Sequence, residues 1–219
     1  MALENIIDFL AELRENNNRE WFQSHKGEYE TAKTIFEEFI NETIAKVAAH
    51  DKSIAALTAK DCIFRIYRDV RFSGDKSPYK TNMGAFVSKY GRKSSGPGYY
   101  FHIEPGASMM AAGVYMPSPA QLSAIRHAIY TDTQKFKKII EKDSFAKMFP
   151  HLDDFDKLKK APKDYPADFQ YIDLLKYKSY IVSRNFSDQD VISGKMQKET
   201  DGFLNEVDPF IKFLSAALA

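Results

Sequence analysis

The feature that most constrains the fold is a change in the spacing of apolar residues along the chain. In the first third they recur every three or four positions, which is the spacing of one face of a helix. From Cys62 to about Met116 the spacing changes to every second position, which is typical of strands. Helical spacing returns after Pro119. Helices, then a sheet, then helices predict an α+β fold rather than a doubly wound parallel sheet.

The loops between the predicted strands are short, and this indicates how the strands pair. We expect strands over residues 62–72, 83–90, 99–104 and 108–116, and the sequence SYIVSRNF (179–186) is a candidate for one more. A parallel crossover needs a dozen or more residues, which these loops do not offer. The sequence therefore predicts an antiparallel meander of about four or five strands, packed against N-terminal and C-terminal helices.

We expect one compact domain over residues 1–219. Within it, 1–60 is predicted to be helical, 61–116 to form the antiparallel sheet and 117–219 to be mostly helical. Asn18 and Ser187 are candidate helix N-caps, because their side chains can accept a hydrogen bond from a backbone N–H group in the first turn. Pro209 is expected to interrupt the last helix, since proline lacks an N–H group.

The composition excludes several classes of protein. There are 31 Lys and Arg residues against 30 Asp and Glu, so no overall charge attracts nucleic acid or lipid, and any basic site must be local. The single cysteine, Cys62, excludes an intrachain disulfide and a cysteine-rich zinc site. We expect a cytoplasmic protein without a membrane partner, because no signal peptide or long apolar run is evident. No cofactor is expected, since no P-loop or dinucleotide-binding glycine motif is present.

The sequence FRIYRDVRFSGDKSPYKTN (64–82) is the most basic stretch of the chain, with five positive charges against two negative ones, a net +3. If residues 62–72 form a strand, alternate side chains separate an apolar face from a polar face. Phe64, Ile66, Val70 and Phe72 would face the core together with Arg68, and an inward arginine needs a partner or a ligand. The predicted strand 99–104 repeats this arrangement, with Tyr100, His102 and Glu104 on its polar face.

This pattern suggests a site for an anionic, phosphate-bearing ligand, because arginine forks and lysine point charges suit phosphate oxygens. The partner would be a small molecule or a nucleic-acid fragment. The candidate ligand-binding residues are Arg65, Arg68, Arg71, Lys76, Tyr79, Lys80, Tyr100 and His102.

Two other interpretations remain open. Asp69, His102 and Glu104 could bind a divalent metal in a hydrolase or nuclease, although their spacing is not diagnostic. Alternatively, the charges pair with one another on a solvated face, as is common in antiparallel sheets, and the chain is a structural or protein-interaction module. The sequence assigns no catalytic residue.

Five segments together resemble the uncharacterised microbial family called domain of unknown function 2461. They are NREWFQSHKGEYE (18–30), FRIYRDVRFSGDKSPYKTN (64–82), PGYYFHIEP (97–105), GVYMPSP (113–119) and DLLKYKSY (173–180). The resemblance extends over nearly the whole chain and implies one compact cytoplasmic α+β domain. It implies no activity, so no catalytic role is transferred to any position. It also points to a second cluster in the first segment, formed by Arg19, Trp21, Lys26 and Tyr29.

Overall fold

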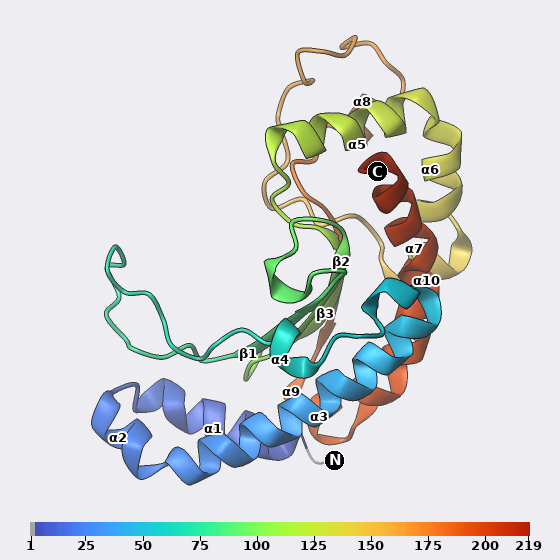
Figure 1. Cartoon of the computed structure of the whole chain (residues 1–219). Helices are drawn as coiled ribbons and strands as arrows, with labels where there is room; N and C mark the ends of the chain where they lie inside the picture. Colours follow the sequence, from blue (N-terminus) through green and yellow to red (C-terminus); the bar gives the residue numbers. More distant parts are fainter. Residues whose placement is uncertain (1–2) are drawn as a thin grey trace. The chain divides into compact units, whose positions relative to one another are not determined.

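The computed structural model describes residues 3–219 (Figure 1). The N-terminal part is helical, with α1 (Glu4–Glu15), α2 (Arg19–Ser24), α3 (Lys26–His50), a 3-10 turn η1 (Lys52–Ile54) and α4 (Ala59–Cys62). The strands β1 (Met83–Val87), β2 (Gly98–Ile103) and β3 (Ser108–Val114) follow, with η2 (Gly91–Lys93) between the first two. The remaining elements are α5 (Pro119–Thr131), α6 (Thr133–Ile140), α7 (Asp143–Met148), α8 (Ile172–Leu175), β4 (Tyr180–Phe186), α9 (Asp188–Ile192) and α10 (Lys195–Ala217).

The strands form one four-stranded antiparallel sheet in the order β1-β2-β3-β4, with helices at both ends of the chain. This confirms the predicted α+β class. Strands β1 to β3 correspond to the predicted strands 83–90, 99–104 and 108–116, and β4 to the candidate strand 179–186. The predicted caps are confirmed too, since Asn18 accepts a hydrogen bond from the Trp21 N–H group and Ser187 accepts one from that of Asp190.

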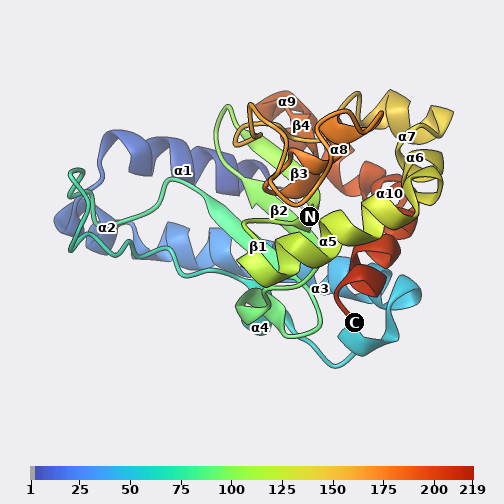
Figure 2. The same ribbon diagram turned by 90° about the horizontal axis from the view of Figure 1, so that it is seen from above.

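The predicted strand 62–72 is wrong. Residues 63–82, here called the hairpin arm, are extended and form two isolated antiparallel bridges: Ile63 pairs with Ala85 of β1, and Tyr67 pairs with Tyr79 within the arm. From one bridge to the other the chain advances four residues between Ile63 and Tyr67 but six between Tyr79 and Ala85. The pairing register therefore shifts between the bridges, and no continuous ladder forms. Figures 1 and 2 show the arm leaving β1 and extending next to α2.

The predicted interruption of the last helix at Pro209 is also wrong. The helical stretch breaks instead at Gly194, whose φ of 73° is accessible to glycine at little cost, and α10 then continues through Pro209. Proline leaves the carbonyl group four residues earlier, that of Asn205, without its helical donor. Asn205 and Pro209 are both exposed, so water can hydrate that carbonyl group.

The backbone separates into two compact units. The first contains residues up to Lys93 together with Tyr100–Met110 and Asn185–Phe203, and the second contains Ser94–Tyr99, Ala111–Arg184 and Leu204–Ala219. Strands β2, β3 and β4 and helix α10 contribute residues to both units. The expectation of a single domain over residues 1–219 stays a prediction.

Each unit has an apolar core of its own. In the first unit the apolar faces of α1 and α3 are buried, and Phe39 packs edge-to-face on Phe101 of β2 with the ring centroids 5.9 Å apart. In the second unit the Phe136 ring contacts those of Phe210 and Phe213. Among residues 3–219 no helix has the length and apolar character needed to cross a membrane.

Candidate functional site

The hairpin arm is attached to the N-terminal helices by Asn17 and a group of aromatic rings. The Asn17 side chain donates a hydrogen bond to the Tyr79 carbonyl oxygen (3.0 Å) and accepts one from the Tyr79 N–H group (3.1 Å). The Tyr79 ring stacks on Phe22 with the centroids 3.9 Å apart and is buried, which raises the pKa of its phenol. Tyr79, a predicted ligand-binding residue, is thus an anchor of the arm.

The second cluster nominated by the family resemblance contributes to the same attachment. The Trp21 ring stacks on His25 at 4.0 Å, and Tyr29 contacts both Phe9 and Phe22. Burial, followed by the charge of Glu30, raises the pKa of Tyr29 to about 12. Phe22 connects this cluster to the arm, because its ring contacts those of Tyr67 and Tyr79.

Three of the five predicted cations are bound by groups of the arm itself. Arg68 forms an ion pair with Asp75, which answers the expectation that this arginine needs a partner. Two nitrogens of Arg71 donate to the Asp69 carboxylate, at 2.9 and 2.6 Å, and Lys76 donates to the carbonyl oxygen of Val70 at 3.0 Å. These pairs are exposed, so they add little stability, but they reduce the positive field of the arm's tip.

Arg65 and Lys80 differ from the other three cations. Within residues 3–219 neither side chain forms an ion pair or a hydrogen bond; the Lys80 Nζ lies 5.5 Å from the centroid of the Phe64 ring. Burial of Lys80, and then the charge of Arg65, lower the pKa of the lysine. Arg65 also acts weakly on Asp69, whose carboxylate is bonded to Arg71. Two neighbouring positive charges are therefore left without a carboxylate bonded to either.

Tyr100 and His102 of strand β2 and Glu104, which follows the strand, lie on one face, as the alternation in the sequence predicted. Their side chains form a series of hydrogen bonds, here called the β2 chain. The Tyr100 hydroxyl lies 2.9 Å from His102 Nδ1, and His102 Nε2 lies 2.9 Å from a Glu104 carboxylate oxygen. When Nε2 donates to the carboxylate, Nδ1 accepts from the Tyr100 hydroxyl. These hydrogen bonds fix the orientation of the Tyr100 and His102 side chains.

Two further residues hold Glu104 in position. The Thr81 hydroxyl donates to its other carboxylate oxygen at 2.9 Å, and Arg14 lies 3.6 Å from that same oxygen. Sequence analysis did not identify Thr81, Arg14 or Asn17, because each meets its partner across a long stretch of sequence; Thr81 belongs to the segment 64–82, but its uncharged side chain gave no signal there. The glycine at position 84 has a local role, since a Cβ atom there would lie 2.7 Å from the Tyr100 hydroxyl oxygen.

The hairpin arm and the β2 chain meet at Phe64. Its ring packs edge-to-face on Tyr100, with the centroids 6.4 Å apart, and it also faces Lys80. Four of the eight predicted ligand-binding residues are connected around Phe64. Lys80 and Tyr100 contact its ring, His102 is hydrogen-bonded to Tyr100, and the charge of Arg65 acts on Lys80. Arg68 and Arg71 form ion pairs within the arm, Lys76 is hydrogen-bonded to a carbonyl oxygen there, and Tyr79 is buried against Phe22.

The arrangement does not support the metal-dependent alternative. Asp69 forms an ion pair with Arg71, whereas His102 and Glu104, at the end of β2, are hydrogen-bonded to each other. In the part of the chain that the structure describes, no three His, Cys, Asp or Glu side chains are grouped closely enough to hold a metal ion.

Comparison with known proteins gave one match. A family model described as conserved hypothetical protein (DUF2461) matches residues 5–213, which include the hairpin arm and the β2 chain. No curated protein and no solved structure matches. The family description names no activity, so the chemistry has to be argued from the residues described above.

Proposed function

We propose that this chain, which belongs to the DUF2461 family of conserved hypothetical proteins, binds an anionic, phosphate-bearing ligand at the base of the hairpin arm. The observation that carries the proposal is the pair Arg65 and Lys80. Two positive charges that act on each other without a bonded carboxylate raise the free energy of the unliganded protein. An anion between them removes this repulsion, and its binding raises the pKa of Lys80 again.

The neighbouring groups suit a phosphate. The planar guanidinium of Arg65 can donate two parallel hydrogen bonds to phosphate oxygens, and Lys80 supplies a point charge. Phe64 covers one side of Lys80, and the half-buried Tyr100, held by His102, packs on the same Phe64 ring next to it. A phosphorylated small molecule and a nucleic-acid fragment both present this group. In this proposal the protein acts in the cytoplasm.

One observation favours a second candidate, a protein-interaction module without ligand chemistry. Phe72 near the tip of the arm is 96% exposed, with the Arg71 guanidinium 5.9 Å from its ring centroid. An exposed aromatic ring beside a cation is a common element of binding surfaces. The same tip contains the internal ion pairs that this candidate requires.

Titration of the full chain with inorganic phosphate, pyrophosphate and a short single-stranded oligonucleotide tests the proposal by calorimetry. We expect Lys80→Gln to weaken binding about tenfold or more, because a hydrogen bond to a charged group is lost. Lys76→Gln is the matched control, since this lysine belongs to the same arm but is bonded to a carbonyl group. Equal losses in both variants, or no binding of any of the three probes, would overturn the proposal.

The pH dependence gives a second readout. The pKa of Lys80 lies below the ordinary lysine value, so its charge is lost earlier than usual as the pH rises. We expect anion affinity to decline at a pH below about 10.4, the ordinary lysine pKa, and this decline to be absent in Lys80→Gln. A decline of the same size in that variant would assign the effect to another group.

A further inference from the structure

Helix α6 and the part of α10 that belongs to the second unit (204–217) border an apolar groove that sequence analysis did not anticipate. Its volume is about 400 Å³. The two helices run in opposite directions, because Lys142, just after α6, meets Glu206, whereas Phe136 within α6 meets Phe213 farther along α10. Figure 1 shows the last turns of α10 next to α6.

The floor of the groove is formed by apolar side chains. Ile139 comes from α6, and Pro209, Phe213 and Ala216 share one face of α10 because they are four and seven positions apart. Pro209 and Ala216 are exposed, whereas the Phe213 ring is held against Phe136 at a centroid distance of 5.0 Å. A proline inside a helix costs a backbone hydrogen bond, so the exposed Pro209 ring is not explained by helix stability. A ligand in the groove would give this ring a contact.

Two of the four lysines along the groove are neutralised by carboxylates of the protein. Lys142 Nζ lies 3.0 Å from Glu206, which also accepts a hydrogen bond from the Ser144 hydroxyl at 3.0 Å. Lys212 Nζ lies 2.7 Å from Asp208, one turn earlier on α10. Glu206 is the one carboxylate among the lining residues, and its charge is therefore already compensated.

The other two lysines, Lys135 and Lys138, select the sign of the ligand. Within the described residues their side chains form no ion pair and no hydrogen bond. They lie three positions apart, so both belong to the face of α6 that lines the groove. The nearest pair on α6, Lys137 with Glu141 at 3.4 Å, is not part of the lining. An apolar floor beside two uncompensated positive charges favours an anion with an apolar chain.

We propose that this groove binds a free medium-chain alkyl carboxylate. The alkyl chain would lie on the floor, and the carboxylate would meet Lys135 and Lys138. The wall of α10 from Pro209 to Ala216 is about 10 Å long, which suits a chain of roughly eight carbons. A groove of this volume matches sites for small ligands, whereas a stable protein partner needs a much larger surface. This inference does not depend on the anion site at the hairpin arm, because the two share no residue.

Calorimetric titration of the full chain with octanoate tests this inference, with 1-octanol and octyltrimethylammonium as matched probes. We expect octanoate to bind with a Kd of about 1 mM or tighter, octanol at least threefold more weakly and the cation at least tenfold more weakly. Affinity should rise about two- to fourfold for each methylene group added from hexanoate to octanoate. Inorganic phosphate at equal ionic strength should not displace octanoate, which separates this groove from the proposed phosphate site.

Two pairs of variants test the charges and the floor separately. The double variant Lys135→Gln with Lys138→Gln should weaken octanoate binding about three- to tenfold at low salt and less at high salt. Lys147→Gln with Lys163→Gln removes the same charge from exposed lysines outside the groove and should leave binding unchanged. Ala216→Trp should fill the groove and weaken binding at least tenfold, whereas Ser215→Trp at the preceding exposed position should not.

Vesicles of phosphatidylglycerol provide the arm of the experiment for a membrane surface, and we expect the chain not to sediment with them. Sedimentation without octanoate binding would overturn the inference. So would equal affinity for octanoate and either matched probe, or an affinity that neither the Lys135 and Lys138 double variant nor Ala216→Trp reduces.

Discussion

The thiol of Cys62 is fully buried at the end of α4, and its ionisation is linked to folding. Burial, and then the charge of Asp61, raise its pKa from an ordinary value of 9.0 to about 11. The unfolded chain therefore releases this proton at lower pH than the folded one. The stabilising contribution is fully present below about pH 9 and is lost as the pH rises toward 11.

We expect the free energy of unfolding of the wild type to approach that of Cys62→Ala between pH 9 and 11, because only the wild type loses this contribution. Urea unfolding of both proteins across this range measures the difference. Tyrosines with raised pKa, such as Tyr29, are present in both proteins and cancel in the comparison. A difference that stays constant to pH 11 would show that the thiol ionises as easily in the folded protein.

The partners of single charged residues were the least predictable part of the site. Alternation along the chain identified Arg68 as the arginine that needs a partner, and the structure supplies Asp75 from the same arm. The two cations without a bonded carboxylate are instead Arg65 and Lys80. Alternation predicts the face on which a side chain lies, but a partner depends on how the chain folds back, which no local pattern specifies.

At the scale of elements, the hairpin arm depends on Asn17, whose amide group bonds to both backbone groups of Tyr79. Asn17→Ala leaves that N–H and that carbonyl group without these bonds in a partly buried place. We expect a loss of about 1–3 kcal/mol in the free energy of unfolding, measured by urea denaturation. We also expect faster hydrogen exchange at the Lys80 amide, which donates to the Ile66 carbonyl within the arm.

Asn16→Ala provides the matched control, because the Asn16 amide donates only to the Glu12 carbonyl oxygen on an exposed surface. A change within about 0.5 kcal/mol is expected there, as for most surface substitutions. If the two variants lost the same stability and left exchange in the arm unaltered, Asn17 would not be the anchor described above.

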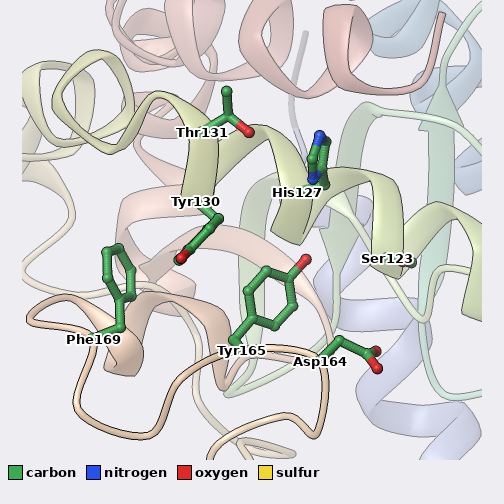
Figure 3. A pocket seen from close by; sticks show the side chains of 7 residues that line it. All are labelled: Ser123, His127, Tyr130, Thr131, Asp164, Tyr165 and Phe169. Carbon is green, nitrogen blue, oxygen red and sulfur yellow. The ribbon is translucent and has the colours of Figure 1, made fainter.

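Elements with a strong local signal were predicted well. Alternation with short turns identified β1 to β3, and side-chain caps marked the starts of α2 and α9. The hairpin arm was misassigned because its apolar residues alternate as in a strand. Its pairing is broken because two more residues separate the two bridges on the returning segment than on the outgoing one. The open pocket between α5 and the segment before α8 (Figure 3) was missed because its walls come from a helix and an irregular segment that share no sequence pattern.

At the scale of the whole molecule, the near balance of 31 basic and 30 acidic residues restricts any basic site to a local cluster. It did not indicate how the chain divides. Strands β2 to β4 and helix α10 each contribute residues to both compact units. Helix α10 runs on across the boundary at 203/204, so one unit cannot unfold alone without breaking hydrogen bonds within this helix, and broken bonds of this kind are costly.

We therefore predict that the chain unfolds as one domain in a single cooperative transition. Trp21, the sole tryptophan, reports on the first unit by fluorescence, and hydrogen exchange followed by mass spectrometry reports on peptides from both units. The urea midpoints from Trp21, from α3 peptides and from α5 peptides should coincide. Peptides from the two parts of α10 provide the internal control, since 195–203 belong to the first unit and 204–217 to the second, and both parts should share the common midpoint. Separate midpoints for α3 and α5 would show two domains and contradict the single domain expected over residues 1–219.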